Sequence, residues 1–145
     1  MMHPFQYVTA KEALSVIQSG NRVFIHGGAC TPLYLLKELA AEKNRLHHVE
    51  IVSITLKGDI EIDKPEYQEA FHINSLFVSG SVRKAVAEGR ADFVPVFLSD
   101  IPDLFKRKIL PLDVAIVQVS PPDKHGYCTL GLSIDIARAA VDSAK

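Results

Sequence analysis

Short apolar runs alternate with amphipathic segments along most of the chain, and this alternation predicts its secondary structure. Apolar runs bounded by glycine, proline or polar residues are typical of strands that a sheet buries on both faces. We expect such strands at 23–25, 49–56, 73–78, 93–96, 113–119 and 127–132. Pro95 should place the strand at 93–96 at an edge or an end of the sheet, because proline cannot donate to a β-ladder.

Two segments with a helical period lie in the first third of the chain. Thr9 and Glu12 form a capping-box pattern, in which a hydroxyl and a carboxylate each bond an end amide of a helix, and Gly20 should end that helix. Thr31-Pro32 suits the N-cap and first turn of a second helix.

Two further helices are expected later in the chain. Ser81 suits the N-cap of a helix over 81–88 that Gly89 ends, and an apolar face over 136–144 predicts a last helix. Because strands and helices alternate, the expected fold class is α/β. We predict a three-layer α/β/α arrangement with a mostly parallel sheet of about six strands.

Composition narrows the function classes. At 145 residues the chain has the length of one domain, and its formal net charge of −1 argues against a nucleic-acid surface, which needs concentrated Lys and Arg. No apolar run approaches the ~18 residues that span a bilayer. The start of the chain lacks a secretory signal pattern and its two cysteines form no disulfide framework, so the expected compartment is the cytoplasm.

A pair of glycines joins the strand expected at 23–25 to the following helix. Gly27 and Gly28 would let backbone N–H groups approach an anion at the positive end of that helix, where a carboxylate or phosphate could dock. The same dipeptide is also typical of a plain tight turn. From the residues alone, both interpretations stay open.

Ser79-Gly80-Ser81-Val82-Arg83 repeats this strand-turn-helix pattern. Arg83 would lie in the first turn of a helix, where a cation opposes the helix dipole unless it faces an acid or an anionic ligand. Its planar guanidinium could therefore clamp a substrate carboxylate, near Ser79. A salt bridge to a surface Asp or Glu is the alternative.

A third polar loop follows the strand expected at 113–119. Pro121-Pro122 ends that strand, and Asp123-Lys124-His125-Gly126 then offers an acid, a base and a titratable imidazole at a strand's carboxyl end. A type I or II turn with Pro122 at its second position explains the same residues without any chemistry.

Other polar features favour structure over function. Four acids surround one lysine in 59–66, which is typical of a solvated loop or edge strand. His47-His48 are adjacent, so in a strand their rings would face opposite ways, and the chain has no Cys-x-x-Cys or His-x-x-x-His pair. We therefore expect no metal site.

Two motifs, Ser120-Pro121-Pro122-Asp123-Lys124-His125-Gly126-Tyr127 and Leu130-Gly131-Leu132-Ser133, resemble the amino-terminal domain of the acetyl-CoA hydrolase/transferase family. The likeness extends back through 98–102, 89–95 and 79–85, and it weakens only before about Gly20. It implies a fold of the NagB/RpiA/CoA-transferase type, followed by a carboxyl-terminal α/β domain that carries a nucleophilic glutamate and most coenzyme A contacts. The chain also stops at Lys145 within a helical pattern, so we expect 1–145 to be the amino-terminal domain of a longer enzyme, without a catalytic residue of its own.

The resemblance implies transfer of coenzyme A between an acyl-CoA and a carboxylate such as acetate, butyrate or 4-hydroxybutyrate, or hydrolysis of acetyl-CoA. Coenzyme A is then a substrate, and the chemistry needs no metal or redox cofactor. The implied partners are acyl-CoA, the carboxylate, the protein's own carboxyl-terminal domain and further copies in a homo-oligomer. The substrate-binding or cleft-lining residues would be Gly27, Gly28, Ser79, Arg83, Pro122, Asp123, Lys124, His125 and Gly126.

A second function class is compatible with the same α/β pattern. A non-catalytic domain that senses a sugar phosphate or another metabolite would need no glutamate beyond Lys145. Stabilisation by a sugar phosphate alone would favour this alternative.

Overall fold

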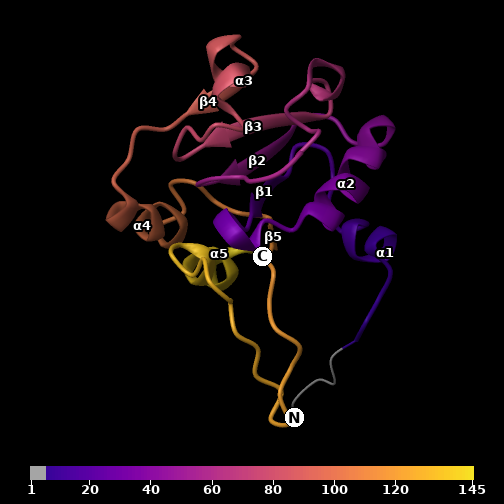
Figure 1. The fold of residues 1–145 in the computed structure, drawn as a ribbon, viewed down its shortest axis with the longest axis vertical. Coiled ribbons are helices and arrows are strands. Elements are labelled where there is room, and N and C mark those ends of the chain that lie inside the picture. Colours follow the sequence, from indigo (N-terminus) through magenta and orange to yellow (C-terminus); the bar gives the residue numbers. More distant parts are fainter. Residues whose placement is uncertain (1–5) are drawn as a thin grey trace.

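Parallel strands form the centre of the computed structural model, which describes residues 6–145. They are β1 (Arg22–Ile25), β2 (Val49–Ser53), β3 (Phe71–Ser75), β4 (Ala91–Phe93) and β5 (Val114–Ile116), in the order β4-β3-β2-β1-β5 (Figure 1). The order runs outward from β1 in both directions, so the chain changes direction between β1 and β5. Open α/β sheets bind ligands outside the carboxyl ends of their strands, close to such a switch point.

Helices cover both faces of this sheet. One hydrophobic cluster includes residues of α1 (Ala10–Leu14), α2 (Leu33–Ala41) and the segment around α3 (Arg83–Ala87). A second cluster includes residues of α4 (Ile101–Lys106) and α5 (Ala137–Ser143). The predicted three-layer α/β/α fold is therefore confirmed, with five parallel strands in place of about six.

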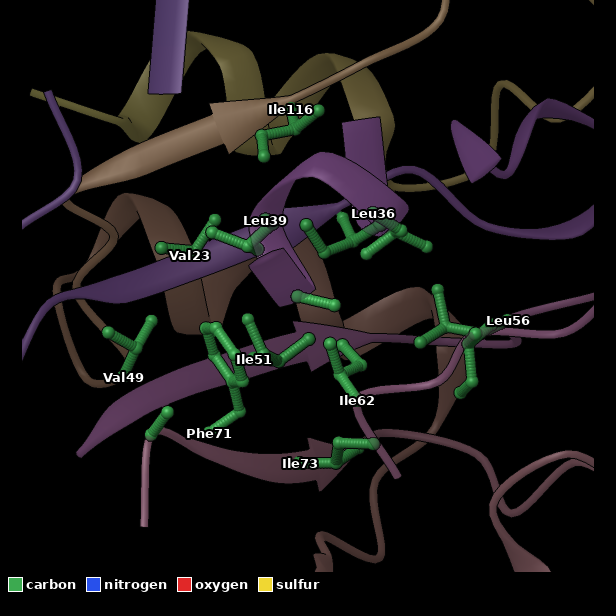
Figure 2. Packing of buried hydrophobic residues seen from close by; sticks show 14 of the residues in the cluster. Val23, Leu36, Leu39, Val49, Ile51, Leu56, Ile62, Phe71, Ile73 and Ile116 are labelled. Atoms are coloured by element: carbon green, nitrogen blue, oxygen red, sulfur yellow. The ribbon is translucent and has the colours of Figure 1, made fainter. Parts of the chain in front are cut away.

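Alternate side chains of each strand enter opposite clusters. Val23 and Ile25 pack with Leu39 of α2, as Figure 2 shows for Val23, whereas Phe24 meets Phe105 of α4 with ring centroids 6.0 Å apart. Complete burial of one such side chain stabilises the fold by about 1.5–3 kcal/mol. Burial on both faces is the reason that the strands appear in the sequence as continuous apolar runs.

The strand predictions need two corrections. Most strands end earlier than the apolar runs, since pairing in β5 stops at Ile116 and in β2 at Ser53. Residues 127–132 form no strand, because they pair only locally: the Ser120 N–H donates to Thr129 O at 3.0 Å. The strand predicted at 93–96 is β4 (Ala91–Phe93), which lies at the sheet edge as predicted, and Pro95 follows its end.

The predicted helices lie at the expected positions along the chain, but their first and last residues differ from the prediction. Thr9 caps α1 by accepting from the Glu12 N–H at 3.2 Å, but α1 ends at Leu14, well before Gly20. Ser81 is not the N-cap of α3, because its hydroxyl bonds Leu56 O instead and Val82 takes the cap position. The short helix α4 has no counterpart among the predicted helices.

Residues 59–66 form an irregular, partly 3₁₀ segment, in agreement with the loop interpretation. Ile60 and Ile62 anchor this loop, because both are buried in the cluster that contains α2. Desolvation by burial raises the pKa of Asp63 above the ordinary aspartate value.

The segment that follows β5 leaves the body of the molecule. Residues 117–134, here called the arm, run outward from the sheet edge and return to α5 (Figure 1). Its two legs are joined by the Ser120 to Thr129 bond and by the Thr129 N–H, which donates to Ser120 Oγ at 2.9 Å. Several apolar side chains of the arm stand in solvent, among them Tyr127 at 75% and Leu132 at 88% exposure.

Candidate functional site

The carboxyl ends of the parallel strands lie at one edge of the sheet, and every residue that the sequence nominated lies in a segment that follows one of these ends. Gly27 and Gly28 follow β1 almost directly, Ser79 and Arg83 follow β3, and the loop at 122–126 follows β5. All three groups therefore leave the sheet in the same direction. Their separation depends on the course of each loop.

The two glycines make a tight turn that lies against the loop after β2. Gly28 has a φ of +59°, and its N–H donates to Thr55 O at 2.7 Å. A Cβ on Gly27 would lie 2.8 Å from the same carbonyl oxygen, so only glycine allows this approach.

The amides of this turn already have acceptors within the chain. The Ala29 N–H donates to Ser133 Oγ at 3.1 Å, and the Cys30 and Thr31 N–H groups donate to Gly27 O and Gly28 O at 3.2 and 3.3 Å. Together with Gly28, these four donors are engaged and do not point to a free anion cradle. The tight-turn interpretation of the sequence accounts for them.

Arg83 is the first residue of α3, and Ser79 lies in the turn that precedes this helix. The carbonyl of Ser79 accepts from the Arg83 N–H at 3.1 Å, and its hydroxyl lies 2.8 Å from Ser81 Oγ. The Arg83 side chain is exposed, and within residues 6–145 it joins none of the salt bridges. The alternative that an acid neutralises Arg83 is therefore not what the described part of the chain shows, and the guanidinium is open to an anion from outside it.

The polar loop after β5 forms the tip of the arm. Asp123 Oδ1 accepts from the N–H groups of His125 and Tyr127 at 2.8 and 2.9 Å, and the Gly126 N–H donates to Asp123 O. The carboxylate thus builds the turn. This turn begins at Asp123, so Pro122 precedes it and does not occupy its second position. Lys124 and His125 are exposed at the tip.

The arm carries this tip away from the other two groups. In Figure 1 the tip and α3 lie at opposite ends of the molecule's long axis. Gly28 and Ala29 instead meet the base of the arm, since Ser133 Oγ would lie 2.5 Å from a Cβ on Gly28. Within this chain the three nominated groups share an edge of the sheet without forming one pocket.

Sequence reasoning missed an apolar hollow at the same edge. Two adjoining cavities of about 420 and 530 Å³ lie beyond β2, β3 and β4, a size typical of small-molecule sites. Thr55 and Asp100 are the polar residues in their walls, and the Thr55 carbonyl is the one that holds Gly28. Shared by both cavities are Leu76, Phe77, Val96 and Phe97.

A signal for this hollow exists in the sequence. Phe77 continues the apolar run of β3 beyond the last paired residue, and Phe97 and Leu98 follow Pro95 after β4. Phe97 is 80% exposed and Phe77 60%. Apolar residues that continue past a strand end, two strands in a row, would have indicated an apolar patch at the edge.

Two further observations concern residues 6–145 only. No group of three or more His, Cys, Asp or Glu side chains there is arranged to hold a metal ion. None of the helices in that range is both long enough and apolar enough to span a membrane.

Comparison with known protein families gives one match over almost the whole chain. Residues 3–145 match the acetyl-CoA hydrolase/transferase N-terminal domain. The chain is 46% identical over 136 residues to a succinyl-CoA:acetate/propanoyl-CoA:succinate CoA transferase of Fasciola hepatica, which covers 92% of this chain and 28% of that protein. It is 44% identical over 138 residues to the 4-hydroxybutyrate coenzyme A transferase of Clostridium kluyveri, with coverage of 95% and 32%.

Solved structures agree with this match. RipA from Yersinia pestis superposes with a TM-score of 0.79 at 29% identity, over 92% of this chain and 34% of that one. A 4-hydroxybutyrate CoA-transferase from Porphyromonas gingivalis superposes with a TM-score of 0.76 at 25% identity, over 94% and 30%. The chain spans about a third of the length of the relatives it matches.

Proposed function

Because this chain belongs to the acetyl-CoA hydrolase/transferase family and corresponds to its N-terminal domain, we propose that it is one half of an active site that transfers coenzyme A between an acyl-CoA and a small carboxylate, or hydrolyses acetyl-CoA. The observation that carries the proposal is the open carboxyl edge of the sheet. An apolar hollow, an exposed arginine that joins no salt bridge within residues 6–145 and a glycine turn lie along this edge.

In this proposal a second domain, beyond residue 145, supplies the nucleophile. Its glutamate attacks the thioester carbonyl, the coenzyme A thiolate leaves, and a mixed anhydride forms. The thiolate then attacks the glutamyl carbonyl, which releases the first carboxylate and leaves a glutamyl thioester. A second carboxylate reverses both steps and takes up the coenzyme. Coenzyme A is a substrate throughout, and no metal or redox group takes part.

The residues of this chain bind and shield the reacting groups. Arg83 would hold the carboxylate of the incoming acid through charge-assisted bonds, with Ser79 beside it. The hollow around Phe77 and Phe97 would take the hydrocarbon part of the acid and keep water from the thioester. Gly27 and Gly28 would line the cleft through their small size, and 122–126 would reach the second domain.

We further propose that the protein acts in the cytoplasm as a homo-oligomer. Both cysteines are free, which suits a reducing compartment, and the exposed apolar residues of the arm suit a contact with another domain or copy. Acetate, butyrate and 4-hydroxybutyrate are the acids proposed as substrates.

An acyl-exchange assay on the protein expressed from its whole reading frame tests this function. Acetyl-CoA is mixed with acetate, butyrate, succinate or 4-hydroxybutyrate, and new acyl-CoA is measured. Arg83→Gln should raise the KM for the carboxylate about tenfold or more, the effect of one lost charge-assisted bond. Lys84→Gln, at the neighbouring cation, which is also exposed, is the control and should leave that KM unchanged.

Two results would contradict the proposal. One is an absence of both transfer and hydrolysis with every acid. The other is thermal stabilisation by a sugar phosphate but not by acyl-CoA, which would favour the metabolite-sensing alternative. The engaged amides at 28–31 do not support a phosphate site.

A further inference from the structure

A histidine that neither the motifs nor the proposed chemistry uses is buried at the carboxyl end of β1. His26 has no exposed surface, and its backbone N–H extends the pairing of β1 with β5 by donating to Ile116 O at 2.9 Å. Its ring lies at the base of the arm. There Nδ1 accepts from the Gln118 N–H at 3.1 Å, and Nε2 lies 2.6 Å from Ser133 O.

The two ring partners fix the protonation state of the imidazole. A backbone N–H can only donate and a backbone carbonyl can only accept, so Nδ1 must carry the lone pair and Nε2 the proton. Both ring nitrogens are satisfied only in the neutral Nε2–H tautomer. A buried imidazole with each nitrogen bonded to backbone is a rigid bridge between two segments.

The segments that it bridges are the two ends of the arm. Gln118 lies at the start of the outgoing leg and Ser133 at the end of the returning leg. The returning leg also touches the glycine turn, because Ser133 Oγ accepts from the Ala29 N–H and the Cys30 thiol lies 3.6 Å from Leu130 O. The ring, the turn and the arm base therefore form one packed unit.

Burial of apolar surface holds the arm at few points. Val117 and Leu130 are partly buried against the cluster that contains α4 and α5, whereas Val119, Tyr127, Leu132 and Ile134 are exposed, so the hydrogen bonds at the base contribute to its orientation. We propose that His26 is a positioning residue whose neutral ring fixes the direction of the arm relative to the Gly27–Gly28 turn. Only the consequence for catalysis rests on the proposed function, in which the arm reaches the second domain.

Two substitutions of His26 each remove one of the two hydrogen bonds of the ring and keep the other. In His26→Asn the amide oxygen replaces Nδ1 and keeps the Gln118 bond, while the bond to Ser133 is lost. In His26→Gln the amide nitrogen replaces Nε2 and keeps the Ser133 bond, while the bond to Gln118 is lost. His72→Gln is the matched control, since His72 lies on β3 and its ring bonds Asp92, away from the arm.

Amide hydrogen exchange resolved by NMR on the 145-residue chain reads the loss at Gln118 directly and the loss at Ser133 through the Ala29 amide, which donates to Ser133 Oγ. We expect the Gln118 amide, which loses its acceptor in His26→Gln, to exchange at least about fivefold faster there. In His26→Asn the Ser133 carbonyl loses its donor, and we expect the Ala29 amide to exchange faster because Ser133 is held less firmly. Unchanged exchange at both amides, as in His72→Gln, would overturn the proposal. A ring ¹⁵N spectrum of the unmodified chain that shows the Nδ1–H tautomer would also overturn it, even if the variants fail to fold.

The acyl-exchange assay distinguishes this inference from the proposed function. With the whole reading frame, His26→Gln should lower kcat at least about fivefold while the KM for acyl-CoA stays within about twofold, because a displaced arm affects the assembled site more than ground-state binding. An inactive unmodified protein would remove the proposed function and leave the exchange result standing.

Discussion

Single backbone atoms decide how closely the loops after β1 and β2 approach each other. Gly27 lies against the carbonyl of Thr55, and Gly28 bonds that carbonyl from a left-handed conformation. Thr55 in turn forms part of the wall of the apolar hollow. A change at one glycine therefore acts on the proposed cleft through its backbone.

Gly27→Ala tests this close approach. Its Cβ would lie 2.8 Å from Thr55 O, and the backbone on both sides must shift. We expect the free energy of unfolding to fall by about 1–3 kcal/mol, measured by urea denaturation. Gly80→Ala is the control, because nothing lies within 4 Å of its Cβ position, and it should leave stability unchanged or slightly higher. Equal effects of the two changes would contradict the steric account.

At the scale of elements, one carboxylate aligns the starts of β1 and β5. Asp113 Oδ2 accepts from the Arg22 N–H at 2.8 Å, and the Asp113 N–H donates to Arg22 O at 2.9 Å. Asp113 Oδ1 accepts from Lys145 Nζ at 2.7 Å. The bond from Lys145, and then the bond from Arg22, lower the pKa of this carboxyl below its usual value.

The stability of the fold should therefore depend on the charge of Asp113. Because the pKa in the folded state lies below that in the unfolded state, the ionised carboxylate stabilises the fold above the unfolded value of 3.8, and this contribution is lost as the pH falls through the folded pKa. Asp113→Asn should be less stable than the unmodified chain at about pH 6, with a difference that shrinks in acid. Urea denaturation across this range measures it. A difference that is independent of pH would contradict the assignment, and Glu69→Gln, at an exposed acid, provides the baseline.

For the molecule as a whole, the sheet separates two hydrophobic layers. Leu39 belongs to the layer with α2, and Phe105 to the layer with α4. No residue belongs to both clusters. A truncation in one layer should therefore change the contribution of the other layer to the free energy of unfolding only slightly.

Paired truncations test this separation. Leu39→Ala should cost about 2–5 kcal/mol and Phe105→Ala about 3–5 kcal/mol in the free energy of unfolding. The double variant should equal their sum within about 0.5 kcal/mol. Phe24→Leu with Phe105→Ala is the contrast, because these rings touch, and their effects should depart from additivity by more than about 0.5 kcal/mol. Strong coupling between Leu39 and Phe105 would show that the layers are not independent.

The alternation of apolar and amphipathic segments was sufficient to predict most elements of the fold. The composition of Val23–Ile25 and of the β2 run is enough to indicate burial on both faces, and the edge position predicted from Pro95 is the position of β4, although β4 ends at Phe93. The segment at 127–132 has a similar composition but no strand beside it. The pattern of apolar residues in a segment indicates the environment in which it could be buried. It does not show whether a partner strand is present.

The candidate site was only partly visible for the same reason. Local sequence indicated the glycine turn, the cation at the start of α3 and the turn at Asp123. It gave no sign that Thr55 and Ser133 take up the amides near Gly28, because those partners lie 27 and 104 residues away from the amides that they accept.

By itself, then, the sequence determined the α/β class, most of the succession of strands and helices and the family resemblance, because each depends on neighbouring residues or on short motifs. Only the tertiary structure decided the strand order, the apolar hollow beyond β2 to β4, the direction of the arm and the bridge at His26. Those features arise where segments far apart in the chain meet, and the free energy of such contacts depends on distances that no local pattern contains.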